Sequence, residues 1–180
     1  VPPINQIIVK GTPTNARELG GGAMVMNDKQ LEDGVLVYDR SLAWFQRRFR
    51  GVPITLVYIP APGAIYRYPT PDVMSAEYYD PNEQPRIGHP HLTPGHKFPA
   101  SAIYASSQKI CERIRAVSLA HGIGFIDTRP AWRKASAHVP LHGPRDWGHP
   151  NEAGYRLLGN LVATRIDEPA KDACDDAWQE

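Results

Sequence analysis

Two residues near the C-terminal end of the chain, three positions apart, could carry acid–base chemistry. Asp146 is followed by Trp-Gly and then by His149, after which Pro-Asn leads into a segment with helical periodicity. On one tight loop, this spacing lets a carboxylate fold back onto one ring nitrogen of the imidazole. The carboxylate then fixes the histidine tautomer and stabilises its cation, while the other nitrogen takes a proton from a hydroxyl nucleophile. The pattern predicts the acid–base half of a Ser-His-Asp hydrolase.

Alternating helices and strands are expected to position this loop. Apolar residues at helical spacing and short β-branched runs define the elements between residues 30 and 166. They are helix 30–50, strand 54–59, helix 101–121, strand 124–127, short helix 128–137 and terminal helix 151–166. This order is typical of an open parallel sheet with helices on both faces, where chemistry collects at the carboxyl ends of the strands. The predicted fold class is therefore α/β.

The other segments are expected to lie at the periphery of the domain. Residues 1–27 predict a hairpin made of strands 6–9 and 23–26, with three glycines between them. The Pro-rich segment 61–99, which has many aromatic residues and no Gly/Ser tract, predicts a long ordered loop. Residues 169–180 are acidic and predict a flexible tail.

Composition and charge restrict the class of protein. The chain has 180 residues, a formal charge of +1 and a hydrophobic fraction of 42%, which fit one globular domain and give no reason to expect nucleic acid as a partner. No apolar run reaches the ~20 residues that a membrane span requires. Cys111 and Cys174 are too few for a disulfide framework. Two free thiols are the preferred interpretation, and a single bridge to the tail is the alternative.

The block from Asp146 to Leu158, Asp-x-x-His-Pro-Asn-x-x-Gly-Tyr-x-x-Leu, resembles the last conserved block of the SGNH (GDSL-type) hydrolases. The resemblance extends from about residue 53 to 166 in the order of the elements. It implies a three-layer, flavodoxin-like α/β/α sandwich, of which residues 1–168 would be the C-terminal part. Many members of this family are bacterial secreted or periplasmic proteins. A Gly-Asp-Ser motif and a Gly-x-Asn-Asp motif, which supply the nucleophile and part of the oxyanion hole in the family, are absent from the sequence.

The activity implied by the resemblance is that of a serine ester hydrolase of the acylesterase or deacetylase type, or of a related acyltransferase. His149 and Asp146 would be the acid–base pair, no cofactor or metal would be needed, and the substrate would be a small-molecule or carbohydrate O-acyl ester. None of the serines lies beside glycine on a strand-to-helix turn, the arrangement that exposes a nucleophile. They are Ser41, Ser75, Ser101, Ser106, Ser107, Ser118 and Ser136. We therefore expect the nucleophilic serine to come from upstream sequence or from a second chain.

Other residues leave alternatives open. Tyr58 and Tyr66 flank the expected crevice and are candidates for substrate binding, although packing explains them equally well. Asp127 could orient His149 or cap the helix that follows it. Three histidines in the Pro-rich loop could hold zinc in a metal-dependent hydrolase; they are His89, His91 and His96. A non-catalytic α/β binding domain with a decayed site is a further alternative.

Overall fold

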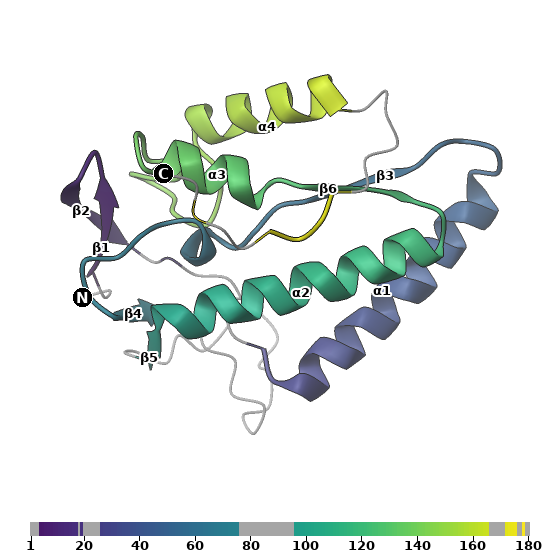
Figure 1. Ribbon diagram of the computed structural model, residues 1–180, viewed down its shortest axis with the longest axis horizontal. Helices are drawn as coiled ribbons and strands as arrows, with labels where there is room; N and C mark the ends of the chain where they lie inside the picture. The colour runs from purple at the N-terminus through teal and green to yellow at the C-terminus, as the bar shows by residue number, and fades with distance from the viewer. Residues whose placement is uncertain are drawn as a thin grey trace.

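The computed structural model describes residues 4–17, 19, 26–75, 96–165, 172–175 and 178. It confirms a mixed α/β protein with a small parallel sheet, and the finer flavodoxin-like arrangement stays a prediction. In Figure 1 the paired strands β3 (Thr55–Tyr58) and β6 (Gly124–Asp127) lie in the middle. Helices α1 and α2 lie below them, and α3 and α4 lie above. No described helix has the length and apolar character to cross a bilayer.

Helix α1 (Asp28–Arg48) begins and ends two residues earlier than the predicted helix 30–50. The Asn27 side chain accepts a bond from the Gln30 amide at 2.8 Å, and the Gln30 side chain accepts one from the Asn27 amide at 3.0 Å, which forms a capping box. The core side of α1 carries Leu31, Val35 and Leu42. The aromatic residues of its C-terminal half stay exposed, among them Trp44 at 52%.

Helix α2 (Ala100–Ala120) packs along α1 and leads into β6. Its N-terminal part follows Pro99, and its buried side includes Ile103 and Ile110. Strand β6 pairs with β3 in parallel, with Leu56 opposite Phe125 and Tyr58 opposite Asp127. The structure thus confirms both strands, and β3 is half-buried along its length.

The N-terminal hairpin differs from the expectation. It consists of β1 (Ile4–Val9) and β2 (Thr12–Arg17), which are antiparallel and joined by a tight turn at Lys10 and Gly11, both with positive φ. The expected second strand at 23–26 lies almost entirely outside the described residues. Ile7 and Ala16 of the hairpin are fully buried in the main core cluster, so this element belongs to the body of the domain.

The Pro-rich segment contains more regular structure than a loop. It begins with a short 3-10 helix, η1 (Pro62–Ala64), and it includes the antiparallel strands β4 (Asp72–Ser75) and β5 (His96–Pro99). Residues 76–95 between these strands lie outside the described part of the chain. The prediction of one continuous loop over 61–99 is therefore wrong at both ends of this segment. Its first part contains η1 and β4, and its last part is β5.

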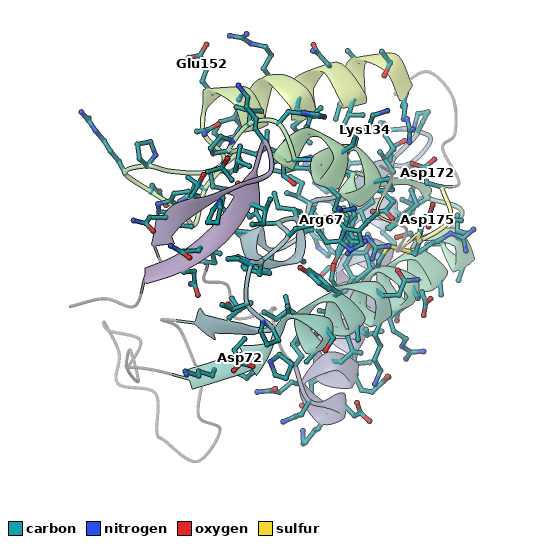
Figure 2. All side chains as sticks on the ribbon, turned by 60° about the vertical axis from the view of Figure 1, so that its left-hand side comes forward. Arg67, Asp72, Lys134, Glu152, Asp172 and Asp175 are labelled. Carbon is teal, nitrogen blue, oxygen red and sulfur yellow. A yellow bond between two sulfur atoms is a disulfide. The ribbon has the colours of Figure 1, made fainter. Side chains whose placement is uncertain are left out.

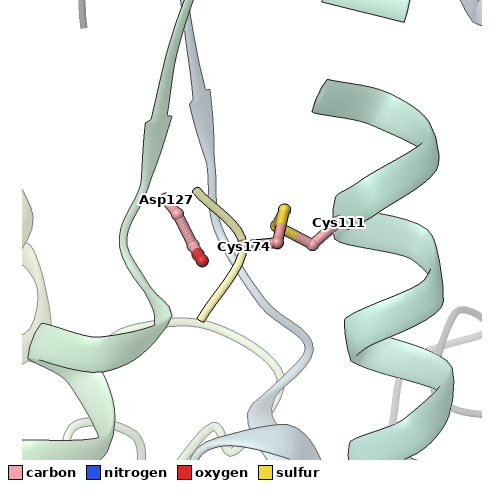
Figure 3. Close-up of side chains that lie close together, drawn as sticks. All are labelled: Cys111, Asp127 and Cys174. Atoms are coloured by element: carbon pink, nitrogen blue, oxygen red, sulfur yellow. A yellow bond between two sulfur atoms is a disulfide. The ribbon is translucent and has the colours of Figure 1, made fainter. Parts of the chain in front are cut away.

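A disulfide joins Cys111 of α2 to Cys174 of the C-terminal segment, which corrects the preference for free thiols (Figures 2 and 3). Asp172 lies close by, where its amide donates to the Phe125 carbonyl of β6 at 3.1 Å and its carboxylate accepts the Asp127 amide at 3.1 Å. The Trp178 ring lies 4.9 Å from the Arg133 guanidinium. At its described residues the acidic tail is therefore held against the domain, in contrast to the expected flexibility.

Candidate functional site

The candidate site is a loop between α3 (Arg129–Ser136) and α4 (Glu152–Arg165). Helix α3 is shorter by one residue at each end than the sequence predicts, and its Trp132 is fully buried. Asn151 caps α4, because its side-chain oxygen accepts the Gly154 amide at 3.1 Å. Figure 2 shows Glu152, in the first turn of α4, pointing away from the body of the domain. The loop thus connects the C-terminal end of α3 to the N-terminal end of α4.

Asp146 and His149 meet on this loop as the sequence predicts. The Nδ1 atom of His149 lies 2.7 Å from Oδ2 of Asp146. The other carboxylate oxygen, Oδ1, accepts the backbone amides of Gly148 at 2.8 Å and of His149 at 3.2 Å. These bonds, first of all the one from the His149 ring, hold the pKa of Asp146 below its usual value. The carboxylate is therefore ionised and fixed in the orientation that an acid–base histidine needs.

The second ring nitrogen of His149, Nε2, has no hydrogen-bond partner within the described residues. The His149 side chain is 75% exposed and that of Asp146 is 60% exposed. Because Nδ1 faces the carboxylate, Nδ1 carries the proton in the neutral ring and Nε2 is the basic atom. A hydroxyl brought to Nε2 could pass its proton to the imidazole, and Asp146 would then stabilise the cation.

The buried side chain of Tyr66 holds the site loop through hydrogen bonds. Its hydroxyl accepts the backbone amides of Leu141 at 2.9 Å and of His142 at 3.0 Å, and it lies 3.0 Å from Nδ1 of the His142 ring. The hydroxyl hydrogen is free to bond Nδ1, which makes His142 a neutral acceptor. Burial lowers the pKa of His142 to about 4, in agreement with a neutral ring. The same cause, burial, raises the pKa of Tyr66.

Asn151 and two glycines close the loop. The Asn151 side-chain amide donates to the Pro140 carbonyl at 2.9 Å and to the His142 carbonyl at 3.2 Å. Gly143 has φ +74° and packs so closely on Trp147 that a Cβ atom would lie 2.4 Å from the indole ring. A Cβ on Gly154 would lie 2.5 Å from the carbonyl oxygen of Leu141. Larger residues at either glycine would push the loop away from its support.

A hollow of about 690 Å³ lies beside the loop. It is lined by residues of the loop, of the start of α4 and of strand β2, among them His142, Trp147, Arg156 and Asn15. Neither His149 nor Asp146 belongs to this lining. The pair therefore faces open solvent at the surface of the domain, and this hollow is on another side of the same loop.

Several other sequence candidates have structural roles. Tyr66 is fully buried, which corrects its proposed role in lining a substrate pocket. Tyr58 stacks on Phe125 at 6.3 Å between ring centroids. Asp127 accepts the Arg129 amide at 3.0 Å and binds its guanidinium at 2.8 Å, so it caps and stabilises the start of α3 and does not orient His149.

The structure brings no serine to the imidazole in the part of the chain that it describes. The serines whose side chains are described lie on helices α1, α2 and α3, and three of their hydroxyls bond carbonyls of the same helix: Ser41, Ser118 and Ser136. His89, His91 and the side chain of His96 lie outside the described residues, so the zinc hypothesis keeps its status as a prediction.

A second histidine–aspartate pair was not indicated by the sequence. Nε2 of His121, at the end of α2, lies 2.7 Å from Oδ1 of Asp39 in α1, and its Nδ1 lies 2.9 Å from Oε1 of Gln46. Its partners are 82 and 75 positions away in the chain. No local spacing could have indicated contacts between residues so distant.

One cluster has the composition of a metal site. The ligand atoms of Cys111, Asp127 and Cys174 lie within 4.8 Å of one another (Figure 3). The two sulfurs are bonded to each other, whereas a metal requires thiolates. The Asp127 carboxylate is also occupied by Arg129. These residues fit a disulfide next to a buried ion pair and do not fit a metal.

Comparison with known proteins does not assign this chain to a family. No family model, no curated protein and no solved structure matches the chain. The function must therefore be inferred from the chain itself.

Proposed function

We propose that the protein is a serine ester hydrolase of the SGNH type, an acylesterase or deacetylase or a related acyltransferase. His149 is the general acid and base, Asp146 orients it, and the nucleophilic serine comes from polypeptide outside these 180 residues. The observation that carries the proposal is the 2.7 Å contact from Nδ1 of His149 to Asp146, which leaves Nε2 directed to solvent. A histidine held in this way has a fixed tautomer, and its Nε2 atom is the one that can exchange a proton with a substrate.

The chemistry is acyl transfer in two steps. The serine hydroxyl attacks the ester carbonyl while Nε2 of His149 takes its proton, and the tetrahedral intermediate breaks the bond to the alcohol oxygen. The imidazolium returns the proton to the departing alcohol. Water, or the hydroxyl of an acceptor in a transferase, then attacks the acyl-enzyme with His149 again as the base. Oxyanion donors, each worth about 3 kcal/mol, would also come from the polypeptide that supplies the serine.

The proposed substrate is an O-acyl ester of a small molecule or a carbohydrate. The exposed position of the pair agrees with a substrate that approaches from solvent. The disulfide supports a protein that works in an oxidising compartment, because such bonds persist in secreted and periplasmic proteins.

Two alternatives remain proposals. A non-catalytic binding domain would keep the fold and the hydrogen bond between Asp146 and His149 without turnover. A metal-dependent hydrolase would use the histidines of the Pro-rich segment, and metal analysis of the purified protein tests it. Less than about one tenth equivalent of zinc would exclude that alternative, since a zinc enzyme holds its metal at near-stoichiometric occupancy.

A serine-directed fluorophosphonate tests the main proposal. The complete protein, including the polypeptide encoded upstream, should be labelled covalently, and the label should be lost in His149→Ala. His138→Ala is a matched control, because His138 is an exposed histidine at the end of α3 that contacts no part of the pair in the described structure. Labelling that survives His149→Ala would refute the proposed role of this histidine.

A further inference from the structure

Exposed apolar side chains gather on the C-terminal half of α1 and on the turn that follows it. Of the nine large apolar side chains that stay exposed in the described structure, six lie between positions 36 and 52. They are Leu36, Val37, Trp44, Phe45, Phe49 and Val52. The Trp44 and Phe45 rings meet edge to face, with centroids 5.2 Å apart, and Phe45 stacks on Phe49 at 6.0 Å. Single exposed apolar residues are normal on a protein surface, whereas a continuous group marks an interaction site.

The same segment is basic, although the whole chain is nearly neutral. Residues 36–54 contain four arginines and one aspartate, a formal charge of +3, whereas the chain of 180 residues carries +1. The arginines, which are all exposed, are Arg40, Arg47, Arg48 and Arg50. The six apolar residues and these four arginines together are called the α1 patch.

The arginines of the α1 patch have no ionic partner within the described residues. In the N-terminal half of α1, by contrast, Asp28 pairs with Lys109 at 2.6 Å and Glu32 pairs with Arg113 at 2.5 Å. The one acid among residues 36–54, Asp39, is bonded to the histidine at the end of α2 at 2.7 Å. No described carboxylate lies within ion-pair distance of the four arginines. Their charge is therefore available to an anionic partner.

Aromatic rings beside unpaired arginines fit the surface of an anionic bilayer. Tryptophan and phenylalanine place their rings at the boundary between headgroups and acyl chains, and arginines are attracted to the anionic lipids. The Arg48 guanidinium lies 5.9 Å from the centroid of the Phe49 ring, so charge and apolar surface are side by side. From Val37 to Arg48 the patch extends about 16 Å along the outer, convex side of a helix. A deformable planar partner covers such a surface, whereas a small ligand needs a concave site.

We infer that the α1 patch binds the surface of an anionic lipid bilayer. Figure 1 shows α1 below the β3–β6 strands and α3 and α4 above them. The loop with Asp146 and His149 connects α3 to α4, so a bilayer below α1 leaves the acid–base pair open to solvent on the far side of the sheet. The patch attaches the protein and takes no part in acyl transfer, and the inference does not depend on the proposed function.

Binding to vesicles of defined composition tests the inference. The complete protein should sediment with phosphatidylcholine vesicles that contain about one third phosphatidylglycerol, and its affinity for vesicles of phosphatidylcholine alone should be about tenfold lower or less. At about 1 M salt the screening length falls to roughly 3 Å, so the preference for anionic vesicles should disappear. Equal affinity for the two kinds of vesicle at low salt, or binding to neither, would overturn the inference.

Two double substitutions of equal charge separate the patch from the net charge of the protein. Arg47→Gln with Arg48→Gln removes two cations of the patch, whereas Lys109→Gln with Arg113→Gln removes two exposed cations that already have ionic partners. The first variant should bind anionic vesicles about 30-fold more weakly, because each arginine near the surface contributes on the order of 1 kcal/mol. The second should lose no more than about threefold. An equal loss in both variants would show that only net charge matters and would refute the patch.

Trp44 reports which face of the protein meets the lipid. Its side chain is 52% exposed, whereas Trp132 and Trp147 are buried. Brominated acyl chains in the anionic vesicles should quench the fluorescence of the wild-type protein, and Trp44→Phe should still bind but lose most of this quenching. Trp44→Ala should bind about tenfold more weakly, because a large apolar side chain is lost. Tyr155→Ala, which removes an exposed ring of α4, should bind as the wild type does. Unchanged quenching in Trp44→Phe would place another face on the bilayer and contradict the inference.

Turnover and self-association separate this inference from the alternatives. The variant with Arg47→Gln and Arg48→Gln should keep wild-type turnover of a soluble ester, because α1 lies across the sheet from α3 and α4. Vesicle binding without fluorophosphonate labelling would refute the hydrolase and support the bilayer, and labelling without vesicle binding would do the reverse. A dimer that Trp44→Ala dissociates, in a protein that binds no anionic vesicles, would show that a second copy covers the patch.

Discussion

The domain contains two histidine–aspartate pairs, which differ in whether the second ring nitrogen of the histidine has a hydrogen-bond partner. In the loop pair, His149 uses Nδ1 for Asp146 and leaves Nε2 in solvent. In the interhelical pair, His121 uses Nε2 for Asp39 and Nδ1 for Gln46, and its side chain is only 18% exposed. Both contacts to aspartate are 2.7 Å long. A short bond to a carboxylate is therefore not evidence of catalysis unless the other nitrogen can reach a substrate.

The two pairs also differ in what they connect. Asp146 and His149 are three residues apart, so their bond shapes one loop and contributes little to the packing of the domain. His121 and Asp39 join α2 to α1, near a hydrogen bond between Tyr38 and Ser118 at 2.7 Å. The interhelical pair should therefore matter for stability and the loop pair for turnover.

The largest expected effect is that of His149→Ala on turnover. In the complete protein, kcat/KM for an acyl ester should fall on the order of 10⁵-fold, because the general base is lost. The melting temperature should change little, since the side chain is exposed. His121→Ala should do the reverse, with turnover kept and about 1–3 kcal/mol of unfolding free energy lost. Equal loss of turnover in both variants would remove the distinction between the pairs.

Asp146→Asn should have the next largest effect. An amide in place of the carboxylate can donate to Nδ1, which favours the wrong tautomer, and kcat should fall about 10³–10⁴-fold. Asp39→Asn is the matched control in the other pair, and it should leave kcat unchanged. Wild-type turnover in Asp146→Asn would show that the carboxylate does not orient His149.

The buried histidine beneath the loop pair, His142, predicts a pH dependence of stability. The buried His142 has its pKa lowered to about 4 from 6.5. Between these values the unfolded chain binds a proton that the folded chain does not, so stability is complete above pH 6.5 and is lost as the pH falls toward 4. The difference corresponds to about 3 kcal/mol. Urea unfolding at pH 7 and pH 4.5 measures it, and the loss should be smaller in His142→Gln.

The smallest expected effect concerns the reactivity of the two imidazoles. Diethylpyrocarbonate should modify His149 faster than His121, because both nitrogens of His121 face oxygen acceptors. Gln46→Ala should release Nδ1 of His121 and raise its modification rate severalfold, at a cost of about 1 kcal/mol in stability. Peptide mapping by mass spectrometry gives both rates. Equal rates for the two histidines in the wild-type protein would contradict the geometry.

Local signals predicted the elements and the loop pair well. The spacing of apolar residues predicts a helix over 30–50, and α1 lies within two residues of these bounds at each end. The run from Gly124 to Asp127 is a strand with the predicted bounds, since every residue in it is buried. Asp146 and His149 meet because only three positions separate them.

Distant contacts and atypical strands could not be predicted. Strand β2 contains Pro13 and few apolar residues, so it lacks the alternation of a strand, and its pairing with β1 forms it. The Tyr66–His142 contact spans 76 positions and the disulfide spans 63. Such pairs arise from tertiary packing, which no short window of sequence contains. Apolar residues at helical spacing are expected on the core side of a helix, but Phe45 of α1 and Phe49, which follows it, are each 45% exposed.

The disulfide makes the site part of a covalent ring. The polypeptide from Cys111 to Cys174 is closed on itself, and this circuit includes β6, α3, both members of the loop pair and α4. A protease that cuts once within the circuit opens it but cannot detach a fragment until the sulfurs are reduced. Damage to the exposed loop would thus leave the severed ends anchored in the same molecule.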